Sequence, residues 1–183
     1  MSLALAIAIL AGLLTVLNVA LTVGVIRRLR EHTERLSNRP QVVSVQVMAE
    51  PGQRSLPFSA VTVDGETVDE SALTGGRTLV GVLANGCSSC EERRPEFVAM
   101  ARRFPRDRVL AILVNGGADV SAELAMLSPV ARVVLQDEPG TGVTAALKVS
   151  GYPAFAIFDA DGTVLTSGTS VEDLDAAPAL AAI

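Results

Sequence analysis

The chain has 183 residues, 49% of them apolar, a net charge of −5 at neutral pH, two cysteines and one histidine. This length suits one domain of ordinary size. From residue 41 onward there are 10 basic and 18 acidic residues, a net charge of −8. Because a basic face supplies most of the affinity for nucleic acids, this balance argues against a nucleic-acid-binding protein.

The N-terminal stretch from residue 2 to residue 26 contains no charged residue. A run of about 18 or more apolar residues is long enough to cross a membrane. A cleaved signal peptide instead has a basic start and a shorter apolar core, whereas no Lys or Arg precedes Arg27. We therefore expect residues 1–27 to form an uncleaved transmembrane anchor.

Four arginines follow this stretch, at positions 27, 28, 30 and 35. By the positive-inside rule, they place the downstream domain in the cytoplasm. Residues 28–54 are first mixed in charge and then polar, with Pro40, Pro51 and Gly52, which predicts a juxtamembrane segment and linker. The only histidine, His32, lies here without a second ligand nearby, so we expect no metal site.

Residues 55–183 form the predicted folded domain. Two Asp-Gly pairs, Asp64-Gly65 and Asp161-Gly162, each lie between short apolar runs and predict β-hairpins. Strands are expected at 78–84, 109–115, 131–135, 155–158 and 163–166. Helices are expected from 87 to about 104, near 121–126, at 143–148 and from 170. Alternating strands and helices that end in a hairpin predict an α/β fold with a mixed sheet flanked by helices.

The cysteine pair comes directly after the predicted strand 78–84. Cys87 and Cys90 are separated by two serines and open the next helix. The free N–H groups and positive dipole of a helix N-terminus stabilise an anion, so a thiol there can lose its proton near neutral pH. Cys87 is therefore the candidate nucleophile. Cys90 lies one turn later on the same face, close enough to attack a mixed disulfide at Cys87.

These motifs resemble the thioredoxin superfamily: a strand, Cys87-Ser88-Ser89-Cys90, a helix containing Pro95, and the distant sequence GYPAFAIFDADG. The leading segment PGQRSLPFSAVTVDGETVDESALTGGRTLVGVL and the predicted anchor narrow the resemblance. They are similar to membrane-anchored thiol-disulfide oxidoreductases of the TlpA/ResA or MauD-like type, which carry a redoxin-type domain. The resemblance covers roughly residues 51–167 and implies a thioredoxin-like mixed sheet preceded by an N-terminal β-hairpin and a single transmembrane helix.

The resemblance also implies site residues and partners. Pro153 is expected to be a cis-proline beside the cysteine pair, and the Tyr152 backbone to pair with an extended segment of a substrate protein. Cys87 would attack a protein disulfide and Cys90 would resolve it, so the expected enzyme is a protein disulfide reductase without a nucleotide or metal cofactor. Electrons would come from a membrane thiol transporter outside the cytoplasm, or from a thioredoxin system inside it.

The resemblance and the arginine cluster disagree about the side of the membrane. The family works outside the cytoplasmic membrane, where disulfides form. One flanking cluster biases topology without fixing it. We therefore expect a single-pass protein of the cell membrane with an extracytoplasmic thioredoxin-like domain.

Three positions depart from the family pattern. The aromatic residue that usually precedes the first cysteine is Gly86, the acidic or amide residue that often lies six positions before that cysteine is Gly81, and the glutamate of the ResA branch is Arg93. Glu92 and Glu96 are nearby in the sequence. The proton acceptor for Cys90 therefore stays unassigned.

Three alternatives remain open. A peroxiredoxin-like thiol peroxidase would carry proline and a hydroxyl residue where this chain has Val80 and Ala84. A non-catalytic thioredoxin-like docking or maturation module would use the same domain with a structural disulfide. The cysteines could also be an ordinary buried, reduced pair. Replacing Cys87 with serine distinguishes redox turnover from docking.

Overall fold

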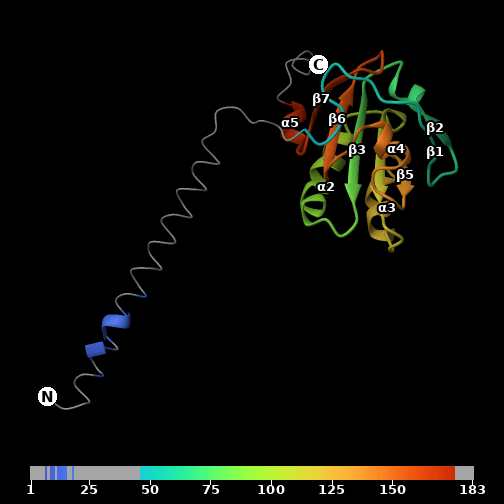
Figure 1. Ribbon diagram of the computed structural model, residues 1–183. Coiled ribbons are helices and arrows are strands. Elements are labelled where there is room, and N and C mark those ends of the chain that lie inside the picture. Colours follow the sequence, from blue (N-terminus) through green and yellow to red (C-terminus); the bar gives the residue numbers. More distant parts are fainter. Residues whose placement is uncertain (1–6, 8, 11, 16–17, 19–45, 176–183) are drawn as a thin grey trace. The chain divides into compact units, whose positions relative to one another are not determined.

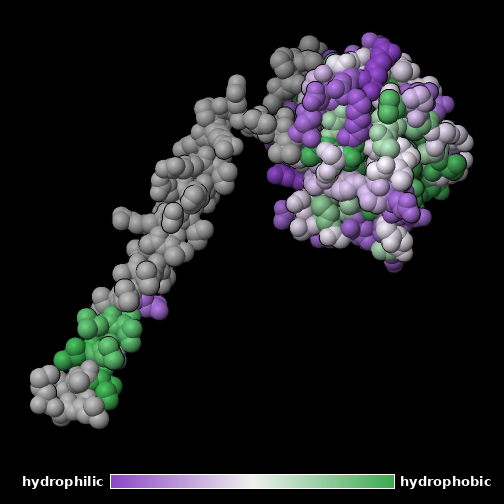
Figure 2. All heavy atoms as spheres, in the orientation of Figure 1, coloured by the Kyte–Doolittle hydropathy of each residue, from purple (hydrophilic) through white to green (hydrophobic). Residues whose placement is uncertain are grey.

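A computed structural model describes residues 7, 9, 10, 12–15, 18 and 46–175. The chain divides into two compact units, Met1–Val42 and Val43–Ile183. In the first unit the described residues are helical, and their large apolar side chains are exposed (Figure 2). Within the described residues, no helix combines the length and hydropathy that a membrane crossing requires. Most of the predicted anchor and the linker up to residue 45 lie outside the described residues.

The second unit is built on a five-stranded sheet with the order β5-β4-β3-β6-β7 (Figure 1). Its strands are β3 (Thr78–Ala84), β4 (Val109–Val114), β5 (Arg132–Gln136), β6 (Ala154–Phe158) and β7 (Val164–Gly168). β3, β4 and β5 run parallel, whereas β6 pairs antiparallel with both β3 and β7. The predicted mixed α/β sheet is thereby confirmed.

Helices cover both faces of this sheet. The core on one face contains residues of α2 (Ser88–Ala101), α3 (Ser121–Leu127) and α5 (Val171–Asp175). The core on the other face contains residues of α4 (Gly142–Ala146), of β2 (Thr67–Asp69) and of the 3₁₀ helix Glu70–Leu73. A second 3₁₀ helix, Arg106–Arg108, precedes β4. The result is a three-layer arrangement with the sheet in the middle.

The apolar side chains of β3 contribute to the hydrophobic cores on both faces of the sheet. Leu79 and Leu83 belong to the core beneath α2, whereas Val80 and Val82 belong to the opposite core. Side chains alternate between the faces of a strand, so a central strand covered on both sides is apolar along nearly its whole length, here from Leu79 onward. This explains why the sequence reads as a continuous apolar run.

Several predicted boundaries shift by a few residues. The predicted N-terminal hairpin is present as β1 (Ser59–Val61) paired with β2, and Gly65 has the positive φ, 82°, that its tight turn requires. α2 ends at Ala101 rather than near residue 104, because the chain turns there before Pro105. α4 occupies Gly142–Ala146 rather than 143–148, and Lys148 takes a positive φ of 55°.

Residues 46–49 pack on the domain although their sequence setting predicted a linker. Val47, Met48 and Ala49 are buried, with exposed fractions of 7%, 3% and 1%. The Ala49 N–H donates to the Leu147 carbonyl at 2.9 Å, and the Val47 carbonyl accepts from Ser150 at 2.8 Å. These hydrogen bonds fix the segment beside the loop that leads into β6.

Candidate active site

The two cysteines lie where β3 ends and α2 begins. Cys87 is the N-cap of α2, and its Sγ accepts a hydrogen bond from the Cys90 backbone N–H at 3.2 Å. Both cysteines are reduced; Cys87 is half-buried, whereas Cys90 is completely buried. The predicted placement at a strand-to-helix junction is confirmed. One sulfur is therefore within reach of a partner molecule, and the second lies behind it.

The buried position of Cys90 changes its chemistry. The pKa of the Cys90 thiol is raised to about 12, chiefly by burial, with smaller contributions from the hydrogen bond and the charge of Cys87. Two groups act in the opposite direction. The Ala84 N–H donates to Cys90 Sγ at 3.5 Å, and the positive charge of Arg94 favours the thiolate. Cys90 thus holds its proton in the resting dithiol state.

The loop before β6 lies next to the cysteine pair, although 65 residues separate Tyr152 from Cys87 in the chain. The Tyr152–Pro153 peptide bond is cis. The Cys87 sulfur lies 4.0 Å from the Tyr152 carbonyl oxygen, which accepts the hydrogen bond of the thiol. Burial, followed by the charge of Cys90, raises the pKa of the Tyr152 hydroxyl. The structure therefore brings together all four residues that the sequence singled out for the site: Cys87, Cys90, Tyr152 and Pro153.

The glycine at position 81 has a steric cause. A Cβ atom added to Gly81 would lie 2.4 Å from a ring carbon of Phe97, closer than atoms pack in proteins. Phe97 comes from α2 and stacks on Phe155 of β6, with ring centroids 5.4 Å apart. An aromatic ring thus occupies the space beneath α2 where a side chain at position 81 would lie. No carboxylate can reach Cys90 from this position.

The glutamates near the cysteines in the sequence lie on the outer side of α2. Glu96 is held by Arg93 at 3.1 Å, and Arg93 also contacts Glu172 of α5 at 3.5 Å. Glu92 is exposed. The face of α2 that points into the protein carries Cys90, Arg94 and Phe97 instead. Neither glutamate is placed on the same side of the helix as the buried thiol.

The buried ion pair between Arg94 and Glu123 was not predicted from the sequence. The side chains are only 7% and 14% exposed, and Arg94 Nη2 lies 3.3 Å from Glu123 Oε1 of α3. A signal for Arg94 was present, because it follows Cys90 by four residues and precedes Phe97 by three, which places it on the buried helical face. Nothing local identifies Glu123 as its partner.

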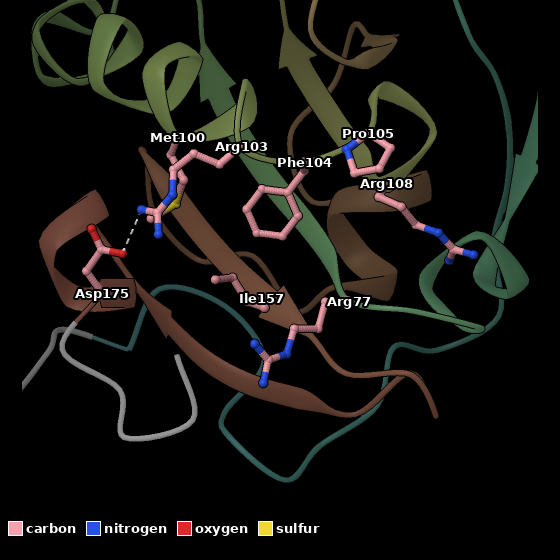
Figure 3. Close-up of a pocket in the computed structure, with 8 residues that line it drawn as sticks. All are labelled: Arg77, Met100, Arg103, Phe104, Pro105, Arg108, Ile157 and Asp175. Carbon is pink, nitrogen blue, oxygen red and sulfur yellow. Dashed lines mark hydrogen bonds and ion pairs between the residues drawn. The ribbon is translucent and has the colours of Figure 1, made fainter. Parts of the chain in front are cut away.

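A separate cavity of about 400 Å³ lies at the end of the central strands opposite to the cysteines (Figure 3). It is lined by apolar side chains and arginines from the residues just before β3 and β4, from the end of α2 and the turn after it, and from β6: Arg77, Met100, Arg103, Phe104, Arg108 and Ile157. Arg103 forms an ion pair with Asp175 of α5 at 3.2 Å. Because Cys87 follows the far end of β3, this cavity is not part of the cysteine site.

No protein-family model matches the sequence. A comparison with curated proteins finds no match either. Solved structures, in contrast, are similar in fold. The thioredoxin domain of a thiol-disulfide oxidoreductase from Bacteroides vulgatus has a TM-score of 0.52 at 17% identity, covering 69% of this chain and 93% of its own.

Two further structures agree. The C-terminal domain of a protein provisionally described as a thiol-disulfide oxidoreductase from Bacteroides thetaiotaomicron has a TM-score of 0.54 at 16% identity, covering 68% of this chain and 90% of its own. A protein provisionally described as the thiol:disulfide interchange protein DsbE from Chlorobium tepidum has a TM-score of 0.50 at 21% identity, covering 66% and 85%. Together with the sheet order and the cis-proline loop, these likenesses show that the chain has the thioredoxin fold.

Proposed function

We propose that the protein is a membrane-tethered thiol-disulfide oxidoreductase that reduces disulfides in protein substrates. One observation carries this proposal. The half-buried Cys87 sulfur lies between the Cys90 N–H, at 3.2 Å, and the Tyr152 carbonyl, at 4.0 Å, with the second thiol buried directly behind it. An accessible sulfur backed by a second sulfur is the arrangement that thiol–disulfide exchange needs.

The proposed reaction begins at Cys87. Its thiolate attacks one sulfur of the substrate disulfide, that bond breaks, and the departing substrate thiolate takes up a proton. Cys90 then loses its proton and attacks Cys87 Sγ, which forms the Cys87–Cys90 disulfide and releases the second substrate sulfur as a thiol. Two electrons and two protons pass to the substrate, and the protein becomes oxidised.

The causes of the raised Cys90 pKa suggest how the second step begins. Two of them, the hydrogen bond and the charge of Cys87, belong to the resting dithiol. In the mixed disulfide Cys87 carries neither a proton nor a charge, so both contributions disappear. The pKa of Cys90 then falls when its thiolate is needed, whereas burial keeps it protonated beforehand.

The substrate would bind along the loop that contains the cis-proline. An extended segment of the substrate protein would pair with the Tyr152 backbone, next to Pro153, and present its disulfide to Cys87. After each cycle a thiol donor would reduce the Cys87–Cys90 disulfide. On the extracytoplasmic side, which we favour, this donor would be a membrane thiol transporter; on the cytoplasmic side it would be a thioredoxin system.

The membrane tether rests on the sequence and on the described part of the first unit. Residues 2–26 carry no charge. Ile7, Ile9, Leu10, Leu13 and Leu14 are exposed on helical backbone, with exposed fractions between 51% and 62%. An exposed face of this kind is costly in water and suits a lipid environment. We propose that this unit anchors the redox domain to the cell membrane by a single pass.

The peroxidase alternative receives little support from the residues around Cys87. Val80 is fully buried on the face of β3 away from α2, and Ala84 has no hydroxyl to assist peroxide cleavage. The docking-module alternative predicts that client binding persists without Cys87. An assay of peroxide consumption tests the first alternative, client binding by Cys87→Ser tests the second, and an experiment on the redox couple tests the proposed function itself.

The decisive experiment is a redox titration of the fragment 43–183 against glutathione and dithiothreitol, with Cys90→Ser as the control. A reversible two-electron couple near roughly −250 mV or below supports a reductase, and a value nearer roughly −120 mV indicates an oxidant. The Cys90→Ser variant should trap a mixed disulfide at Cys87. If no Cys87–Cys90 disulfide forms at any potential, the proposed function is wrong.

A further inference from the structure

A buried ion pair lies behind the cysteine site and has no role in the reaction described so far. Arg94 of α2 is 6% exposed, and its guanidinium contacts Glu123 of α3 at 3.3 Å. The Nε atom of Arg94 is buried without a hydrogen-bond partner. Cys90 and Phe97 of α2 and Leu127 of α3, from the same two helices, belong to one hydrophobic core.

A buried ion pair is weak evidence for a stabilising role. Removing two charges from water costs about as much as their attraction returns, and apolar residues of similar size often stabilise a protein more. A buried donor without a partner adds to that cost. The position of Arg94, one helical turn after Cys90 on the same face of α2, indicates what the charge does there.

We propose that Arg94 is a positioning residue for the redox reaction: its buried charge, partly neutralised by Glu123, stabilises the Cys90 thiolate during the attack on Cys87. The inference rests on the proposed function and goes beyond it, because it assigns the group that assists the resolving sulfur. It also provides a substitute for the carboxylate that is absent at position 81. The family pattern supplies a proton acceptor for the buried thiol, whereas this protein stabilises the Cys90 thiolate that forms.

The other groups around Cys90 do not supply a positive charge. Cys87 and the Tyr152 hydroxyl are neutral or negative, and the Ala84 N–H is a fixed dipole. Among the groups that shift the pKa of Cys90, Arg94 is the one cation, and it lowers that pKa. The negative charge of Glu123 opposes this effect. Arg94 and Glu123 are therefore expected to have opposite effects on the stability of the Cys90 thiolate.

The test uses the full-length protein and dithionitrobenzoate, an aromatic disulfide that releases a coloured thiolate. The first equivalent is released when Cys87 attacks the reagent, and the second when Cys90 attacks the resulting mixed disulfide. Stopped-flow absorbance separates the two phases, and the second phase reports the reactivity of Cys90. Its rate is measured from neutral to alkaline pH.

Arg94→Met should slow the second phase and leave the first phase nearly unchanged. A guanidinium one helical turn away shifts a thiol pKa by about one unit, which changes the thiolate fraction about tenfold. Because a more basic thiolate is also more nucleophilic, the net slowing is about three- to fourfold near neutral pH. Arg94→Lys, which keeps the charge, should recover most of the rate. Arg93→Met, on the exposed side of α2, is the matched control and should change neither phase.

Glu123→Gln should change the rate of the second phase in the opposite direction. Without the carboxylate the charge of Arg94 is no longer neutralised, so the second phase should become faster. A slower second phase in this variant would overturn the inference, because it would make Glu123 itself the proton acceptor. An unchanged second phase in Arg94→Met, with a native circular-dichroism spectrum, would overturn it as well.

The number of coloured equivalents that the wild-type protein releases distinguishes a failure of the Arg94 role from a failure of the proposed function. If the wild-type protein releases only the first coloured equivalent, Cys90 does not resolve mixed disulfides, and both proposals fail. If it releases both equivalents and Arg94→Met behaves in the same way, only the role of Arg94 fails.

Discussion

At the scale of single residues, one close packing contact explains a departure from the family pattern. Gly81 has no side chain because the ring of Phe97 lies against its backbone, 2.4 Å from the position of a Cβ. The ring stacks in turn on Phe155. The residue at position 81 is therefore determined by the volume available to it.

Gly81→Ala should destabilise the domain by about 1–3 kcal/mol, because overpacking a dense core forces neighbouring side chains and backbone to shift. Urea denaturation monitored by circular dichroism measures the change in free energy of unfolding. The double variant Gly81→Ala with Phe97→Leu should lose less stability than the two single variants added together. Strict additivity would contradict the proposed steric cause.

The raised pKa of Cys90 predicts how stability depends on pH. The thiol ordinarily loses its proton near 9.0, whereas in the folded, reduced protein its pKa is about 12. Between these values the unfolded chain binds fewer protons than the folded one, so the stability of the reduced protein falls as pH rises. The contribution is fully present below pH 9.0.

The oxidised protein has no thiol at Cys90 and should lack this dependence. We expect the gap in melting temperature between the oxidised and reduced proteins to widen above about pH 9. Reduced Cys90→Ala is the control and should lose most of the alkaline slope. A parallel decline in wild type and variant would assign the slope to other groups.

At the scale of secondary-structure elements, the segment 46–49 supports the loop that contains the cis-proline. Val47 lies against Gly151, where an added Cβ would come within 3.2 Å of Val47 Cγ1. The Val47 carbonyl accepts from the Ser150 N–H, and Gln46 Nε2 donates to Ser167 Oγ of β7 at 2.8 Å. Residues just before Tyr152 are thus held by a segment more than 100 positions earlier in the chain.

A fragment that begins at residue 55 should be less stable than one that begins at residue 43. It lacks the buried side chains of Val47 and Met48, and burying one such side chain contributes about 1.5–3 kcal/mol. We expect a loss of about 3 kcal/mol or more in urea denaturation, with slower reduction of a protein disulfide because the Tyr152 loop is less constrained. Fragments of equal stability and activity would show that the segment is dispensable.

At the scale of the whole molecule, the chain combines an apolar N-terminal unit with an acidic domain of the thioredoxin fold. The net charge of −8 from residue 41 onward disfavours binding of that domain to anionic lipid surfaces. Membrane attachment would therefore depend on the first unit. This separation of roles can be tested by cutting the chain between the two units.

The full-length protein should sediment with membranes and remain there after an alkaline carbonate wash, whereas the fragment 43–183 should stay in solution. A thiol reagent that does not cross membranes, applied to intact cells, should label Cys87 if the domain is extracytoplasmic. Labelling that requires permeabilised cells would instead support the orientation indicated by the arginine cluster. A full-length protein removed by the wash would contradict the anchor.

The sequence alone determined the local features of this protein. The apolar run gave β3 its observed bounds, the Asp-Gly pair predicted the first hairpin, and the position of Cys87 and Cys90 at a strand-to-helix junction was correct. These features depend on residues that are near one another in the chain, such as strand alternation, turn dihedrals and helix capping. The cis bond before Pro153 came from a motif resemblance and is also present.

Only the tertiary structure decided the environment of the buried sulfur. It placed Phe97 against Gly81, joined Arg94 to Glu123 from another helix, and packed Val47 beside Gly151. Each contact joins elements whose separation is set by how the helices and the N-terminal segment pack on the sheet. No local pattern encodes these distances, so the sequence located the two cysteines, and the fold determined which charges and side chains surround them.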